Sequence, residues 1–352
     1  MQPHQFHSIT FMRKKITIYD IATELNITAA TVSRALNNNP NISKATKEIV
    51  LATAEKMGYE QNKLALALKS GKSNNVGVVV PRIDTNFFGS VIRGIEEELT
   101  PFGYHVIICQ TNNDEEKENA NIDALLNSQV DGIFISTSSN DIVSFERILK
   151  KDVPLIFFDR KKTMNNVSSV TINDFEGGYK ATQHLIDSGC KRIAHFSGDL
   201  NIEIFSDRFA GYKQALNDNG IDYIEEYVSR TRSNIEDGKK AVKKLLKLKN
   251  PPDAIFSSSD WDALGAIQEL KSKNYKVPDD VAVIGFSNEP FTKFMELSIS
   301  TIDQFPLEMG RIAAKVFLEQ VNNSEKVKIE KKVVLDPELI IRKSTKKIAP
   351  KK

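Results

Sequence analysis

The chain has 352 residues, a net charge of +2 and 27% charged residues. This length exceeds what one small core needs and predicts roughly two or three folding units. No apolar run reaches membrane-spanning length and residues 1–10 lack the apolar core of a signal peptide, so we expect a cytoplasmic protein whose Cys109 and Cys190 stay reduced.

The charged residues are unevenly divided along the chain. Residues 1–75 contain ten Lys and Arg against five Asp and Glu, whereas the rest of the chain contains 38 against 41. A small basic region is typical of a segment that neutralises nucleic-acid phosphates. The near-neutral remainder suits a different kind of ligand.

Two short helices joined by a tight turn are predicted within residues 16–36. Thr17 and Thr28 are suited to cap the two helices, and Asn26 tolerates the left-handed conformation that the turn requires. Periodic apolar residues place one buried stripe on each helix: Ile18, Ile21, Ala22 and Leu25 on the first, and Val32, Ala35 and Leu36 on the second.

The outward face of the second helix is built from small residues and one arginine. It carries Ala29, Ala30, Ser33 and Arg34, and a helix with so little bulk on one side can enter a DNA major groove. The same periodicity also fits an ordinary helical hairpin inside a larger core. The flanking segments therefore decide between the two interpretations.

A third helix is predicted between Ser43, a capping residue, and Gly58, and it completes a compact three-helix module. Its apolar stripe is expected to contain Ile42, Ala45, Ile49 and Ala52. The following segment KLALALK (63–69) is a short helix candidate. Because so short a helix is marginal in water, we expect it either to order only in a complex or to pack as a connector.

From residue 76 onward short apolar runs alternate with helical patterns, which predicts parallel α/β sheets. The first series has strands at 76–80, 104–109, 132–136, 155–159 and 167–172, and helices at 88–100, 115–128 and 144–150. The second has strands at 192–197, 254–257 and 281–286, and helices at 175–188, 207–219, 235–248 and 260–273. The last segment is predicted to hold strands at 300–302, 331–335 and 338–341 and a helix at 307–321.

A series of short motifs runs through the chain. They are TIYDIA (17–22), TVSRALN (31–37), the 62–69 segment, VGVVVP (76–81), GIEEEL (94–99), VDGIFI (130–135), PLIFFDR (154–160), RFAGY (208–212) and VIGFSN (283–288). In this order and spacing the sequence resembles the LacI/GalR family of bacterial transcription regulators over residues 15–343.

The resemblance implies a specific domain organisation. An all-α helix-turn-helix head at 15–61 would follow an N-terminal arm at 1–14, and a hinge helix and linker would occupy 62–75. Residues 76–343 would form an effector-binding and dimerisation domain of two doubly wound parallel-sheet lobes, similar to type I periplasmic binding proteins. Chain crossovers are expected near residues 173, 303 and 336, and a basic tail at 344–352.

The resemblance also implies a homodimer that binds a palindromic DNA operator. Ala29 and Ala30 would contact base edges and Arg34 a guanine edge. Thr17, Thr28, Thr31 and Ser33 would contact phosphates or cap helix ends. In the hinge, the DNA contacts would come from Asn62, Lys63, Ala65, Leu68 and Lys69, with Leu68 wedged into a central base step.

A small-molecule effector is expected at the carboxyl ends of the strands, in the cleft between the lobes. The candidate residues are Asp84, Asn86, Phe87, Phe88, Asp159, Arg160, Arg208, Ser259, Asp260, Trp261, Ser287, Asn288 and Gln304. Arg208 matches the family arginine that reaches ligand hydroxyls, since a guanidinium can hold two oxygens at once. Phe87, Phe88 and Trp261 would either stack on a sugar or pack in the core.

Three of these positions depart from the family pattern. Asn86 replaces a proline, Ser259 an asparagine and Ser287 an aspartate. Because serine offers one neutral hydroxyl in place of two carboxylate oxygens, Ser287 leaves open a phosphate, a carboxylate or a larger glycan beside a simple sugar. We expect an inducer-type repressor of a carbohydrate pathway.

Two other classes of protein are weighed against a regulator. A periplasmic-type sugar-binding transport protein would share the two lobes, but the basic head and the lack of a signal peptide oppose it. An enzyme is not expected, because the five histidines show no metal spacing and no nucleophile–base series or phosphate-binding loop stands out. We therefore predict no metal and no cofactor.

Overall fold

The computed structural model describes residues 16–60, 72–139, 142–323 and 330–345. The chain divides into two compact units, Met1–Gly71 and Lys72–Lys352. The N-terminal arm, the hinge residues Asn62, Lys63, Ala65, Leu68 and Lys69, and most of the basic tail lie outside the described residues.

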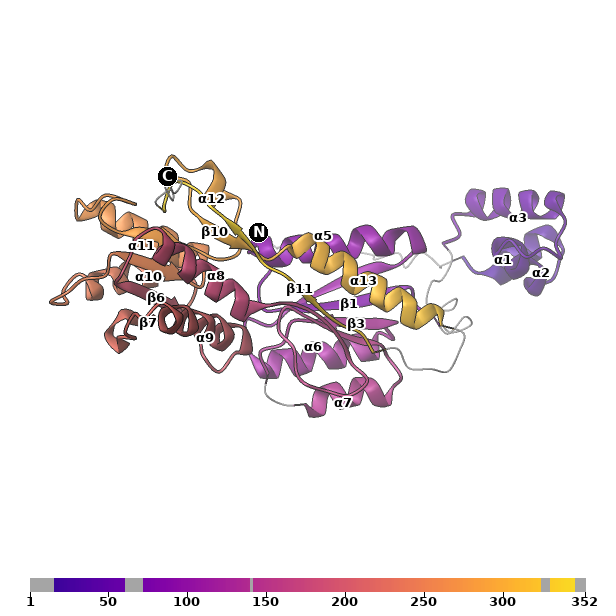
Figure 1. The fold of residues 1–352 in the computed structure, drawn as a ribbon. Coiled ribbons are helices and arrows are strands. Elements are labelled where there is room, and N and C mark those ends of the chain that lie inside the picture. Colours follow the sequence, from indigo (N-terminus) through magenta and orange to yellow (C-terminus); the bar gives the residue numbers. More distant parts are fainter. Residues whose placement is uncertain (1–15, 61–71, 140–141, 324–329, 346–352) are drawn as a thin grey trace, which may run out of the picture. The chain divides into compact units, whose positions relative to one another are not determined.

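The first unit is the predicted three-helix module (Figure 1). Its helices are α1 (Ile18–Leu25), α2 (Ala29–Leu36) and α3 (Lys44–Met57). Asp20 accepts a hydrogen bond from the Thr17 N–H at 2.8 Å, and the Thr28 hydroxyl accepts one from the Thr31 N–H at 3.2 Å. Asn26 adopts the left-handed conformation, with φ of 52°. The predicted caps and turn are therefore confirmed.

Of the apolar stripe predicted for α3, only Ile42, just before the helix, packs against the core, and the other three residues do not. Val50 and Ala54 are buried against Ile21 and Val32, whereas Ile49 is 56% exposed and Ala45 and Ala52 are also exposed. The sequence of α3 offers two apolar stripes one residue apart, one through Ile49 and one through Val50. Packing against α1 and α2 buries the stripe that contains Val50. Ala29 is half-buried against this core, so it does not lie fully on the outward face of α2.

The second unit begins with a six-stranded sheet in which all neighbours are parallel, in the order β11-β5-β4-β3-β1-β2. Its strands are β1 (Asn75–Val80), β2 (His105–Gln110), β3 (Gly132–Ile135), β4 (Leu155–Phe158), β5 (Ser168–Ile172) and β11 (Lys332–Leu335). The associated helices are α5 (Asn86–Leu99), α6 (Glu115–Asn127), α7 (Val143–Lys150) and α13 (Pro306–Asn322), with a short 3₁₀ helix at Thr100–Phe102. We refer to this part as lobe 1.

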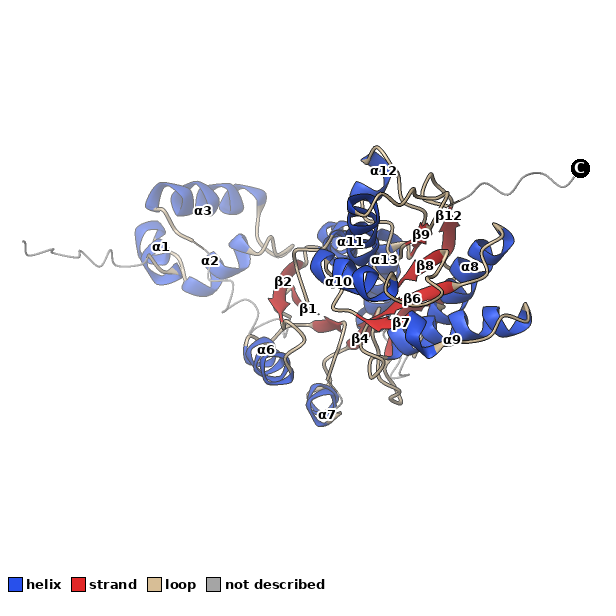
Figure 2. Cartoon of the chain, turned by 90° about the vertical axis from the view of Figure 1, so that its left-hand side faces the viewer, coloured by secondary structure: helices blue, strands red, loops and turns tan. Residues whose placement is uncertain are grey.

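Lobe 2 is built on a four-stranded parallel sheet in the order β7-β6-β8-β9. Its strands are β6 (Ile193–Ser197), β7 (Val228–Arg230), β8 (Ala254–Ser257) and β9 (Ala282–Ile284). Its helices are α8 (Asp174–Asp187), α9 (Glu203–Asp218), α10 (Ile235–Leu245), α11 (Asp260–Ser272) and α12 (Phe291–Phe294), with a 3₁₀ helix at Glu225–Tyr227. Helices cover both faces of this sheet, as Figure 2 shows. The strand pattern did not predict β7, which is only three residues long.

The chain passes between the lobes more than once. It leaves lobe 1 after β5 and enters lobe 2 at α8, and it returns to lobe 1 through α13 and β11. An antiparallel pair, β10 (Thr301–Asp303) with β12 (Glu338–Ile340), joins the segment before α13 to the segment after β11. The late helix α13 packs closely on α5 (Figure 1), where a Cβ at Gly94 would lie 2.2 Å from the Leu307 carbonyl oxygen. This close packing positions the N-terminus of α5 beside the strand ends.

Candidate functional site

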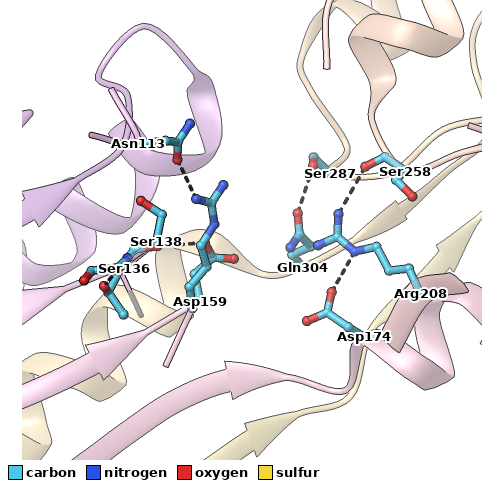
Figure 3. A network of polar contacts seen from close by, with 12 residues as sticks. Asn113, Ser136, Ser138, Asp159, Asp174, Arg208, Ser258, Ser287 and Gln304 are labelled. Atoms are coloured by element: carbon cyan, nitrogen blue, oxygen red, sulfur yellow. Dashed lines mark hydrogen bonds and ion pairs between the residues drawn. The ribbon is translucent and has the colours of Figure 1, made fainter. Parts of the chain in front are cut away.

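A pocket of about 110 Å³ lies between the lobes, at the carboxyl ends of strands from both sheets. Lobe 1 supplies its wall from α5 and the loops after β1 and β4, and lobe 2 from α9, α11 and the loops after β7, β8, β9 and β10. The lining residues are Arg82, Thr85, Phe87, Phe88, Asp159, Arg160, Ile204, Phe205, Arg208, Ser233, Ser258, Ser259, Trp261, Ser287, Glu289 and Gln304. Figure 3 shows polar side chains of the two lobes facing one another across this region.

Arg208 is the most firmly held of the pocket's charged residues. Its Nε donates to Asp174 Oδ1 at 2.7 Å, its Nη1 donates to the Ser258 carbonyl at 3.1 Å, and the residue is 3% exposed (Figure 3). The guanidinium carbon also lies 3.7 Å from the centroid of the Phe286 ring. Burial raises the pKa of Asp174 above its usual value, and the positive charge of Arg208 opposes that rise.

The corresponding pair in lobe 1 is looser. Arg160 Nε lies 3.8 Å from Asp159 Oδ2, beyond hydrogen-bond distance, while its Nη1 donates to Asn113 Oδ1 at 2.7 Å. Among the described residues, the buried Arg160 Nε has no hydrogen-bond partner. Ser136 donates to Asp159 at 2.9 Å. Burial raises the pKa of the Asp159 carboxyl, and the positive charge of Arg160 opposes that rise. Asp159 itself has φ of 58°, in the left-handed region that costs a non-glycine residue free energy.

The serines that replace family residues have other roles as well. Ser287 donates to Gln304 Oε1 at 2.9 Å and has φ of 112°, so its loop is strained at the pocket wall. The Ser259 hydroxyl accepts a hydrogen bond from the Trp261 N–H at 3.2 Å and thereby caps α11. The pocket is lined by both serines and by their partners Trp261 and Gln304.

The aromatic candidates pack against neighbouring rings and also line the pocket. Phe87 and Phe88 are each 7% exposed and meet edge to face with their ring centroids 5.1 Å apart, yet both reach the pocket wall. Trp261 lines the pocket and packs on Phe291, with the ring centroids 4.7 Å apart. These rings provide the apolar part of the wall.

Four predicted effector residues do not line the pocket: Asp84, Asn86, Asp260 and Asn288. Asp84 forms an exposed ion pair with Arg82 at 2.8 Å, and Asn86 is exposed at the start of α5. The Asp260 carboxylate is fully buried and accepts from the Glu289 N–H and the Thr301 hydroxyl, both at 2.8 Å. Asn288 bonds to Asp303 and Arg342.

The side chains of these four residues are exposed or hold a neighbouring loop, and each residue adjoins one that lines the pocket. Their role in effector binding stays a prediction. The lining residues that the prediction missed are Arg82, Thr85, Ile204, Phe205, Ser233, Ser258 and Glu289. Thr85, Ser258 and Glu289 each adjoin a predicted residue.

The predicted DNA-contacting residues lie on the second helix of the head and at the helix ends. Ala30 and Arg34 are exposed on α2, and Thr17 and Thr28 are exposed at the N-termini of α1 and α2. Thr31 and Ser33 are half-buried, and Thr31 also shares a 2.9 Å hydrogen bond with the Thr28 hydroxyl. The exposed face of α2 is thus small and carries a single cation.

The described residues contain neither a metal-binding group of side chains nor a membrane-spanning helix. Within those residues, no group of three or more His, Cys, Asp or Glu side chains is placed to hold a metal ion. Over the same part of the chain, none of the helices combines the length and the apolar character needed to cross a bilayer.

Comparisons with known proteins agree with this two-unit arrangement. A family model described as periplasmic binding proteins and sugar binding domain of the LacI family matches residues 73–336, and one for bacterial regulatory proteins of the lacI family matches residues 17–62. Catabolite control protein A of Priestia megaterium is 34% identical over 94% of this chain and 99% of its own.

Solved structures agree in fold. A complex of the transcriptional regulator CelR with cellobiose matches with a TM-score of 0.71 and 26% identity, over 94% of this chain and all of that one. A lac repressor dimer bound to operator and the anti-inducer ONPF has a TM-score of 0.84 and covers 95% of this chain and 100% of its own; at 23% identity it shows the fold alone. The chain therefore belongs to the LacI family of bacterial regulatory proteins, and it is a DNA-binding transcription regulator rather than an enzyme.

Proposed function

We propose that the protein is a repressor that binds a palindromic operator as a homodimer and releases it when a carbohydrate fills the pocket between the lobes. The observation that carries this proposal is the set of buried polar groups on the pocket wall that bond incompletely within the described residues, namely Arg160 Nε and the Thr85 hydroxyl beside the Asp159 carboxylate. Buried donors of this kind call for an acceptor.

A polyhydroxylated ligand matches these groups. One sugar hydroxyl can donate to Asp159 while a neighbouring oxygen accepts from Arg160, and the Thr85 hydroxyl can take a third. The Phe88 and Trp261 rings on the same wall suit the apolar face of a sugar ring. The cellobiose bound by CelR, a structural relative, supports the choice of ligand class.

Regulation would follow from the pocket's position across two lobes that each contribute charged residues. A ligand that bonds to both lobes favours one arrangement of them over another. At the start of the second unit, Asp131 accepts hydrogen bonds from the Ser73 N–H at 2.8 Å and the Asn74 N–H at 2.9 Å. Because residues 73 and 74 are tied to lobe 1, a movement of this lobe would be passed to the proposed hinge at 62–75.

On DNA, Arg34 would read a guanine edge and Ala30, with the half-buried Ala29, would contact thymine methyls. Thr17, Thr28, Thr31 and Ser33 would position the head on phosphates. Arg34→Ala should relax base preference at one operator position by about 1–3 kcal/mol. A variant that weakens binding to all sequences equally would show that Arg34 contacts only the backbone.

Fluorescence anisotropy with labelled upstream DNA and a panel of neutral mono- and disaccharides tests the whole proposal. We expect one sugar to lower operator affinity in the wild type and to have little effect in Arg160→Met. Tighter operator binding with the sugar would overturn the inducer part. A full panel that leaves affinity unchanged, alongside an effect from a different class of compound, would overturn the carbohydrate part.

A further inference from the structure

The N-terminus of α5 in lobe 1 lacks its usual local cap. Thr85 occupies the N-cap position, but its hydroxyl accepts no capping bond and, within the described part of the chain, has no hydrogen-bond partner. The first amides of a helix have no acceptor inside the helix, so a buried helix start needs one from elsewhere.

A carboxylate from lobe 2 lies at this helix start. The carboxylate of Glu289, in the loop after β9, shares the pocket wall with Thr85 and Phe87, and the backbone N–H groups of Asn86 and Phe87, the first two residues of α5, lower its pKa. Glu289 is 5% exposed and lies on the pocket wall, and the positive charge of Arg82 lies close enough to interact with it. The helix dipole adds to the attraction.

The backbone of Glu289 is firmly anchored. Its N–H donates to Asp260 Oδ2 at 2.8 Å, and its carbonyl accepts from the Thr292 hydroxyl at 2.6 Å. Asp260 is itself fully buried and held by Thr301. The carboxylate of Glu289 is therefore presented to lobe 1 by a rigid loop, and this explains what the buried Asp260 contributes to the pocket.

The positive groups of the pocket are already matched by acids. Among the lining residues, Arg82 pairs with Asp84 at 2.8 Å, Arg208 with Asp174 at 2.7 Å, and Arg160 lies 3.8 Å from Asp159. The remaining positive site, the α5 N-terminus, is taken by Glu289. A carboxylate or phosphate on a ligand would find the charge of each arginine already paired, with Arg160 Nε as an open donor, and would be repelled by Glu289.

We propose that Glu289 is a specificity-determining residue: a built-in anion that fills the anion site at the α5 N-terminus, joins the two lobes and restricts the effector to uncharged carbohydrates. This inference rests on the proposed function for the ligand class but not for the anion site itself. Burial raises the pKa of Glu289, and the two N–H donors oppose that rise.

The first test removes the built-in anion and offers a small one in its place. In Glu289→Ala, 50 mM sodium acetate or inorganic phosphate should raise the melting temperature by several degrees relative to sodium chloride at equal ionic strength, because the added anion binds at the exposed α5 N-terminus. The wild type and Glu296→Ala, a change at an exposed acid in the same lobe, should show no such rise. Equal responses in all three proteins would overturn the proposal.

The second test uses matched sugar pairs and an isosteric variant that keeps the pocket filled. Calorimetry with glucose and glucuronate, galactose and galacturonate, and glucose and glucose 6-phosphate should show that the wild type never binds the charged member more tightly. For the sugar pair that binds, the affinity ratio of the charged to the neutral sugar should be at least tenfold higher in Glu289→Gln than in the wild type. A charged sugar preferred by the wild type would overturn the proposal.

The two tests separate this inference from the proposed function. If acetate stabilises Glu289→Ala while no carbohydrate binds the wild type, the anion site stands and the carbohydrate class fails. If a neutral sugar binds but neither anion rescue nor a change in charge preference is seen, the role of Glu289 fails and the carbohydrate class stands.

Discussion

Each of the two lobes brings one largely buried Asp–Arg pair to the pocket, and the two pairs differ in how far their hydrogen bonds are completed within the protein. In lobe 2, Arg208 donates to Asp174 and to a carbonyl and stacks on Phe286. In lobe 1, Arg160 stands 3.8 Å from Asp159, with its Nε lacking a partner among the described residues. The first pair is built as a structural clamp and the second as an incomplete site.

The resemblance singled out Arg208 as the arginine that binds the ligand, whereas this difference favours Arg160. A matching motif shows that an arginine occupies the position, but it does not show how many of its donors the protein itself uses. Arg208 donates from Nε to Asp174 and from Nη1 to the Ser258 carbonyl. Its hydrogen bonds to a ligand would therefore depend on its remaining N–H donors. Arg160 has more to gain from a ligand because burial without a bond is costly.

The largest effect is expected from Arg208→Met. Removing one partner of a buried ion pair leaves Asp174 uncompensated, so the free energy of unfolding should fall by about 3–5 kcal/mol. Urea unfolding followed by the fluorescence of Trp261, the single tryptophan, reports on this unit. The double variant Arg208→Met/Asp174→Asn should recover part of the loss. Unchanged stability in Arg208→Met would show that the clamp interpretation is wrong.

The next effect concerns ligand affinity in the other pair. Arg160→Met removes the donor that lacks an internal partner, and effector affinity should fall about 10- to 100-fold, the effect of losing roughly 1.5–3 kcal/mol of a charge-assisted hydrogen bond. Stability should fall less than in Arg208→Met, since only the bond to Asn113 is lost. Calorimetric titration and urea unfolding on the same samples measure both quantities. Asn113→Ala is the matched control, and a similar loss of affinity there would assign the effect to positioning.

Two buried carboxylates outside these pairs, Asp260 and Asp262, sharpen the comparison through their response to pH. Burial raises the pKa values of Asp260 and Asp262 to about 7. The unfolded pKa is about 3.9, so between pH 4 and 7 the folded state holds more protons and stability falls as pH rises, by up to about 1.4 kcal/mol per pH unit and group. Above pH 7 the fall should level off.

Asp262→Asn tests the assignment, because asparagine keeps an acceptor for the Asn234 N–H and the Thr231 hydroxyl can turn to the Ser197 carbonyl. Urea unfolding from pH 5 to 8 should give a flatter profile for this variant than for the wild type. An identical slope would mean that Asp262 titrates near its ordinary pKa.

Much of this architecture followed from local sequence patterns. Apolar runs located the longer strands, and the rule that ligands lie at strand ends located the loops that form the pocket. Side-chain direction within those loops did not follow. Ser259 lines the pocket, but its neighbour Asp260 does not, because the Asp260 carboxylate accepts hydrogen bonds from the Glu289 N–H and the Thr301 hydroxyl, far along the chain.

The same limit explains the other differences. In α3, Ile49 and Val50 are equally apolar, and only packing against α1 and α2 decides which is buried. Glu289 caps a helix that begins near residue 86, and no periodicity or spacing links segments so far apart in the chain. Contacts of this kind depend on how the lobes are assembled, which a local pattern does not carry.

The smallest effect is expected from Thr85→Val, which removes one hydroxyl with almost no change in shape. Replacing a working N-cap threonine ordinarily costs about 0.5–2 kcal/mol. Here Glu289 caps α5 instead, so stability should stay within about 0.5 kcal/mol or rise slightly as a buried unsatisfied group disappears. Effector affinity should still fall about two- to tenfold, since Thr85 lines the pocket and its hydroxyl has no partner among the described residues. A loss of stability with unchanged affinity would mean that Thr85 is a cap after all, and that the lobe 1 wall is more complete than the comparison of the two pairs implies.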